Sequence, residues 1–103
     1  MDKIKIPKRA KLNAQMAISA NYLLKKNSCA TLVGKRRANQ ILSNDYLSIT
    51  TAKRTFSYLS RARTYNNNDW TSCGTISFNL WGGEEMLKYL QKKFLSNEKQ
   101  TFL

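Results

Sequence analysis

The sequence contains no histidine and only six acidic residues among 103. Histidine is the usual general base at neutral pH and a frequent metal ligand, so its absence removes the commonest participant in acid–base catalysis. A zinc site needs about four clustered Cys, His or carboxylate ligands, and the only adjacent carboxylates are Glu84 and Glu85. We therefore expect a protein that is not an enzyme and that uses no metal and no cofactor.

Long apolar runs are also missing. The longest runs are a few residues, far short of the roughly 20 residues that span a bilayer. The basic start, residues 3–11, is not followed by the hydrophobic stretch of a signal peptide. We expect no membrane association.

The chain has only two cysteines, Cys29 and Cys73. A disulfide requires only that the two thiols meet in the fold, and spacing does not decide that. A chain without a secretion signal more often keeps its thiols reduced and buried. We expect free, structural cysteines, with a disulfide as the alternative.

What the chain does have is segregated positive charge. Residues 1–65 hold fourteen Lys and Arg against Asp2 and Asp45, whereas residues 66–103 balance four Lys against four acids. The length predicts one domain, and eleven aromatic residues favour a folded core. We expect a basic flexible lead at 1–9, one helical domain at 10–95 (basic to 65, neutral at 70–95) and a tail at 96–103.

Apolar periodicity predicts a mostly α fold, a compact bundle of four to five short helices. A first helix is expected after Pro7, over about 8–26, with Leu12, Met16, Ala20 and Leu23 facing the core. A second begins at Gly34, and a third runs from about 48 to 65 with Ser48 or Thr50 as its N-cap. These two form a helix-turn-helix-like unit. The expected core positions of the second and third helices are Val33, Ala38, Ile41, Leu42, Ala52, Phe56, Leu59 and Ala62.

The neutral part begins with a loop at 66–69, rich in Asn and Asp. We expect a short helix at 76–81, in which Trp81 anchors the core, and a break at Gly82 and Gly83. A last helix opens on the two glutamates, which suit its N-terminal end. Its core residues are expected to be Leu87, Leu90 and Phe94.

The excess of cations indicates a surface that meets a polyanion, most plausibly nucleic acid. Three cations, at 35–37, are expected at a helix N-terminus, where they oppose the helix dipole and an anion would remove the conflict. The alternative is that these cations form a solvated face that aids solubility and binds nothing specific. The predicted nucleic-acid-binding residues are Lys8, Arg9, Lys11, Lys35, Arg36, Arg37, Lys53, Arg54, Arg61 and Arg63.

Other residues suggest finer recognition. The residues with hydrogen-bonding groups for base edges or phosphates are Asn39, Gln40, Thr50, Thr51 and Ser57. Tyr58 and Tyr65 could stack on unpaired bases, although aromatics at helical spacing are more often core. The predicted contacts to a protein partner are Trp70, Asn67 and Asn68.

Two segments, RRANQILSNDYLSITTAKRTFSYLSRA and CGTISFNLWGG, are separated by the Asn/Asp-rich loop and followed by an amphipathic helix. Their order resembles a short module of tailed-bacteriophage proteins, over more than half of the chain. Relatives in that family often have glycine near Asn44 and a second tryptophan near Tyr89. The resemblance implies a phage origin and a compact helical fold, and it transfers no catalytic residue.

The resulting hypothesis is a small basic phage-type protein that binds nucleic acid mainly through phosphates, with DNA favoured over RNA. Its expected location is the host bacterial cytoplasm or the virion. The alternative is a virion structural or assembly protein, or an inhibitor that binds a nucleic-acid-processing complex of the host. Strandedness, sequence preference and oligomeric state stay open.

Overall fold

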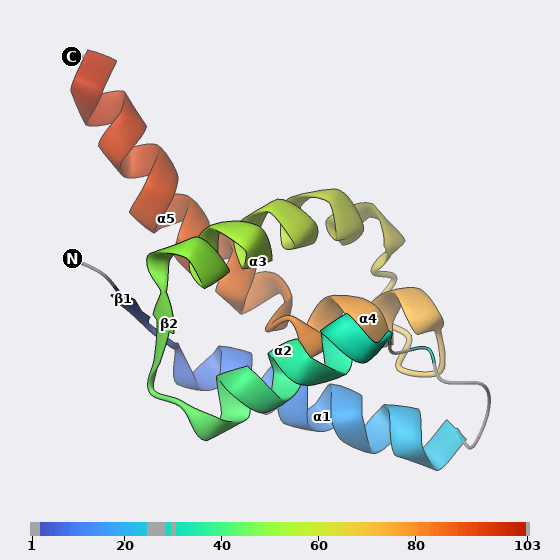
Figure 1. Cartoon of the computed structure of the whole chain (residues 1–103). Helices are drawn as coiled ribbons and strands as arrows, with labels where there is room; N and C mark the ends of the chain where they lie inside the picture. The colour runs from blue at the N-terminus through green and yellow to red at the C-terminus, as the bar shows by residue number, and fades with distance from the viewer. Residues whose placement is uncertain (1–2, 25–28, 30, 103) are drawn as a thin grey trace.

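In the computed structural model, which describes residues 3–24, 29 and 31–102, five α-helices make up most of the chain (Figure 1). The mostly α bundle is therefore confirmed. None of the helices in these ranges has the length and apolar character needed to cross a membrane. The helices are α1 (Lys8–Leu24), α2 (Leu32–Ser43), α3 (Ile49–Ala62), α4 (Cys73–Leu80) and α5 (Gly83–Phe102), and a 3-10 turn, η1 (Arg63–Tyr65), follows α3.

Helix α1 begins directly after Pro7 as predicted, but it buries a different face from the one predicted. Its fully buried residues include Ala10, Ala14 and Ala17. Of the stripe expected in the core, Ala20 is half-buried and packs on the core, whereas Leu12 is 53%, Met16 49% and Leu23 73% exposed. Helix α1 contacts α2, α4 and α5. The side of α1 that carries alanines is buried because small side chains let these three helices pack close to α1.

The predicted break at Gly82 and Gly83 is confirmed, with φ of 110° and 73°, values that favour glycine. The side-chain amide of Asn13, on α1, donates to the Gly82 carbonyl at 2.9 Å and to Glu85 Oε1 at 2.6 Å. A Cβ atom at position 83 would lie 2.6 Å from Asn13 Nδ2. Gly83 therefore lets α1 and the turn between α4 and α5 pack directly, whereas Gly82 leaves room for Met86 of α5. Trp81 is 7% exposed, as expected of an anchor.

The start of the chain forms a strand, which corrects the prediction of a flexible lead. Strand β1 (Lys3–Lys5) pairs antiparallel with β2 (Tyr46–Ser48), with Ile4 opposite Leu47. The Ile6 amide continues the pairing by donating to the Asp45 carbonyl at 2.8 Å. Side chains alternate as in a half-buried strand, with the lysines exposed and Ile6 buried. The pairing needs a partner more than 40 residues away, which local sequence does not reveal.

Helix α3 follows the prediction closely. Ser48 is its N-cap, because its hydroxyl accepts from the Thr51 amide at 3.1 Å. Ala52, Leu59 and Ala62 are buried and Phe56 is half-buried. Helix α2 begins two residues earlier than predicted, at Leu32, with Thr31 as N-cap. Its first-turn residue Val33 is consequently exposed, whereas Ala38 and Ile41 are buried.

The expectation of free cysteines is wrong, because Cys29 and Cys73 form a disulfide across 44 residues. The bond joins the connection between α1 and α2 to the start of α4. The backbone of Cys29 is held at this place independently, since its amide donates to Asn21 Oδ1 and its carbonyl accepts from the Ser77 hydroxyl. The fold therefore brings the two thiols together, which the spacing of the cysteines along the chain does not reveal.

The C-terminal half agrees with the sequence until its last residues. Segment 76–81 lies almost entirely in α4, and Leu87 and Leu90 of α5 are buried with Phe94 packed beside them. Helix α5 then continues to Phe102, through residues predicted as a tail.

Candidate nucleic-acid interface

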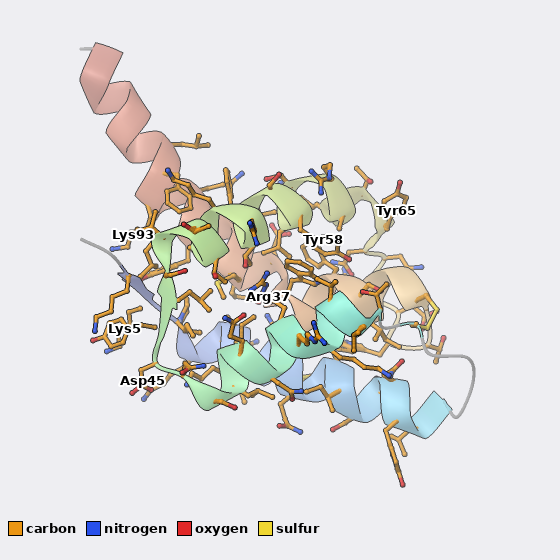
Figure 2. The ribbon with its side chains drawn as sticks, viewed as in Figure 1. Lys5, Arg37, Asp45, Tyr58, Tyr65 and Lys93 are labelled. Carbon is orange, nitrogen blue, oxygen red and sulfur yellow. A yellow bond between two sulfur atoms is a disulfide. The ribbon has the colours of Figure 1, made fainter. Side chains whose placement is uncertain are left out.

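The cations of α2 and α3 lie on two helices that flank a shared aromatic cluster. Lys35 and Arg36 of α2 are exposed, as are Lys53, Arg54 and Arg61 of α3. Figure 2 shows Arg37 of α2 and Tyr58 of α3 in the space between the two helices. We call Lys35, Arg36, Arg37, Lys53, Arg54 and Arg61 the α2–α3 cations.

The aromatic cluster fixes the position of Arg37. The Tyr58 ring stacks on Trp81 with centroids 4.1 Å apart and planes 15° from parallel. The Arg37 Cζ atom lies 4.9 Å from the centroid of the Trp81 ring, within cation–π range. Trp81 thus joins α2, α3 and the turn that leads into α5, and it holds one guanidinium in a defined place.

Arg37 is electrostatically strained in this place. Partial burial, and then the positive charge of Arg54, lower the pKa of the Arg37 guanidinium from its ordinary value. Arginine still carries its charge at neutral pH. Its Nε atom is buried and has no hydrogen-bond partner among the residues described, while Nη1 donates to Gln40 Oε1. An anion between Arg37 and Arg54 would reduce their repulsion.

Two of the predicted binding residues are instead paired with acids. Lys11 Nζ lies 3.6 Å from Asp45 Oδ1, and Arg63 Nη2 lies 3.0 Å from Glu84 Oε2. Both pairs are partly exposed and contribute little to stability, but they lower the local excess of charge. For Lys8, Arg9 and the α2–α3 cations, the described part of the chain offers no acidic partner.

The cations at 35–37 lie farther from the start of α2 than predicted. Because α2 begins at Leu32, the cations at 35–37 are its fourth to sixth residues, beyond the first turn where the dipole acts most strongly. The helix end is already capped, since the Thr31 hydroxyl accepts from the Gly34 amide at 3.0 Å. The structure therefore does not support the predicted anion site at the N-terminal end of α2. The reason to expect an anion is instead the repulsion between Arg37 and Arg54.

Several residues expected to contact bases are occupied within the protein. The Thr51 hydroxyl accepts a hydrogen bond from the Ser48 hydroxyl, and the Ser57 hydroxyl accepts one from Arg61 Nη1 at 3.2 Å. The Tyr58 ring is stacked on Trp81. Asn39, Thr50 and Tyr65 are exposed.

The sequence pattern did not indicate one exposed aromatic residue, Tyr22. Tyr22 of α1 lines a pocket of about 250 Å³ between α1 and α2, together with Lys35 and Asn39 and above the buried Leu80. Tyr22 lies outside the apolar stripe of its helix, so periodicity gave no reason to select it. The pocket brings an aromatic ring and an amide beside Lys35, which is one of the α2–α3 cations.

The three residues predicted to contact a protein partner have different surroundings. Asn67 has a structural role, because its Oδ1 accepts from the Asp69 amide and from the Thr75 hydroxyl. Asn68 is exposed with φ of 61°, a left-handed conformation that asparagine tolerates. Trp70 is half-buried beside α1. Hydrogen bonds from the backbone and side chain of Thr71 lower the pKa of Asp69, which fits a loop ordered from within.

The Tyr58 stack predicts a late-titrating tyrosine. Burial raises the pKa of Tyr58, and the Ser77 hydroxyl and Arg61 oppose the effect only in part. A folded-state pKa above the unfolded value gives a stability contribution that is lost as pH rises above about 10. An alkaline titration followed by tyrosinate absorbance should show one late phase, which Tyr58→Phe removes and Tyr65→Phe leaves in place. A late phase that survives Tyr58→Phe would contradict the buried stack.

Comparison of this chain with protein-family models, with curated proteins and with solved structures finds no match.

Proposed function

We propose that this protein binds nucleic acid through phosphate contacts made by the α2–α3 cations. The observation that carries the proposal is their lack of acidic partners in the described ranges, combined with an arginine that Trp81 holds beside a second cation. Cations on two helices that converge on one cluster match the repeated negative charge of a phosphate backbone. Binding would release counterions and would weaken as salt rises.

DNA is the proposed polymer, and a tailed phage is the proposed source. Helices α2 and α3 follow each other in the order of a helix-turn-helix, in which the second helix enters the major groove. Lys53, Arg54 and Arg61 would then contact phosphates from α3. The connection contains a short strand, and α2 packs on α1 and α4 while α3 packs mainly on α5, so phosphate contact is the primary proposal and base readout is secondary.

A second candidate, a structural component of a virus particle, gains support from the disulfide. Disulfides persist in oxidising surroundings such as virion surfaces and are rare in the cytosol. The Cys29–Cys73 bond therefore favours the particle over the cytoplasm as the place where this chain works. Binding to the packaged genome would fit both candidates.

The proposal is tested by binding measurements on duplex DNA, single-stranded DNA and RNA across a salt series. Arg54→Glu should weaken binding roughly tenfold and lower the salt slope by about one, because Arg54 is exposed and unpaired within the residues described. The matched control is Lys92→Glu, the same reversal on an exposed residue of α5. Filter binding between about 50 and 200 mM salt gives both quantities.

Two outcomes would reject the proposal. One is an affinity that does not change with salt, and the other is an equal loss in the Arg54 and Lys92 variants. Pull-down after nuclease treatment separates a directly bound protein from one bridged by nucleic acid.

A further inference from the structure

The exposed side of α1 carries a row of apolar residues that the other described residues leave uncovered. Leu12, Met16 and Leu23 are each about half exposed or more. With Ser19 they follow one another at spacings of four, three and four, the spacing of a helix–helix seam. We call Leu12, Met16, Ser19 and Leu23 the α1 stripe. Large apolar side chains gathered on one surface mark interaction sites more often than free surface.

The α1 stripe is bordered by two shallow hollows that side chains of another helix could fill. The first, about 420 Å³, lies where Leu12 meets Leu42 of α2, with Lys8 and Lys11 at its edge. The second, about 290 Å³, lies where Met16 and Leu23 meet Trp70. Trp70 is therefore placed beside the stripe by the loop after α3, in keeping with its predicted contact to a partner.

The charges around the stripe select the kind of partner. Helix α1 contains Lys8, Arg9 and Lys11 but no acidic residue; Lys11 is paired with Asp45 of the α2–β2 connection, whereas Lys8 and Arg9 have no acidic partner among the described residues. A second copy of this chain would place an equally cationic helix against it, with a net charge of +12 on each molecule. Such charges repel within a screening length of about 10 Å. A helix with acidic residues beside its apolar face would be attracted instead.

We propose that the α1 stripe docks an amphipathic helix of another protein, one whose apolar residues recur at helical spacing and are flanked by Asp or Glu. This mode places apolar anchors in a groove and lets flanking charges set orientation. The α1 stripe shares no residue with the α2–α3 cations, although α1 packs directly on α2 and Leu42 of α2 lines the first hollow (Figure 1). The proposal does not depend on nucleic-acid binding.

The test uses a synthetic helical peptide with Leu at heptad positions a and d and Glu at positions e and g. The glutamates repel each other and keep the peptide monomeric at neutral pH. Calorimetry should show saturable one-to-one binding, and a version with Lys in place of Glu should bind at least roughly tenfold more weakly. Met16→Asp and Leu23→Asp should each reduce binding of the acidic peptide roughly tenfold.

The matched control is Thr50→Asp, which makes the same one-unit charge change at an exposed residue of α3 and should leave peptide binding nearly unchanged. Circular dichroism confirms that each variant is folded. Equal losses in the Met16 and Thr50 variants would overturn the proposal, because the peptide would then be held by general charge. So would sedimentation showing a dimer of the unmodified protein that Met16→Asp converts to a monomer, since a second copy would then occupy the stripe.

Discussion

Replacement of Trp81 by alanine is expected to lower the free energy of unfolding by about 3–5 kcal/mol. The substitution removes the stack with Tyr58 and the platform beneath Arg37, both made by one buried ring. It also leaves a cavity where α2, α3 and the turn before α5 meet. Because small domains are stable by about 5–15 kcal/mol, the variant should be marginal.

Urea unfolding followed by circular dichroism measures this loss. Trp70→Ala makes the same chemical change at a half-buried position, and it should cost clearly less, below about 2 kcal/mol. Trp81→Phe keeps an aromatic ring and should recover part of the loss. Equal effects at Trp70 and Trp81 would contradict the anchoring role of Trp81.

Removal of the disulfide, by the double change Cys29→Ser and Cys73→Ser, is expected to cost about 2–4 kcal/mol. The bond closes a loop of more than 40 residues, and crosslinks of this span restrict the unfolded chain strongly. The hydrogen bonds of Cys29 to Asn21 and Ser77 do not need the bond, so the fold should survive with lower stability.

The measurement compares unfolding curves with and without a thiol reductant. Reduction should shift the unmodified protein to the midpoint of the double serine variant, and it should not affect that variant. A reductant that leaves the unmodified protein unchanged would show that the bond contributes nothing to stability.

The predictability of the helices depended on how local their signals are. The start and the buried face of α3 were predicted correctly, because its serine cap and apolar stripe lie within the segment itself, whereas its last three predicted residues form the 3-10 turn η1. Helix α1 was located correctly, but the face predicted to be buried was wrong. Large residues dominate an apolar pattern, whereas in this helix the alanines form the face that packs closely. Strand β1 and the disulfide depend on partners more than 40 residues away, so no local pattern indicates them.

The candidate site was predictable in composition but not in detail. Charge segregation selected the cations of α2 and α3 from sequence alone. It could not show that Lys11 and Arg63 have acidic partners, since Asp45 and Glu84 are distant in sequence. Nor could it show that Arg37 rests on Trp81, 44 positions later, or that Tyr22 reaches the edge of the same surface.

The positions of the two tryptophans give the molecule two separate optical reporters. Trp81 lies under Arg37 beside the α2–α3 cations, and Trp70 lies in the hollow beside Met16 and Leu23. The fluorescence of an indole responds to the charges and the water around it. A polyanion on one surface should therefore change the emission of Trp81, and a helix on the other should change that of Trp70. The variants Trp70→Phe and Trp81→Phe each keep one tryptophan and an aromatic ring at the replaced position, so they can distinguish the two events without any attached dye.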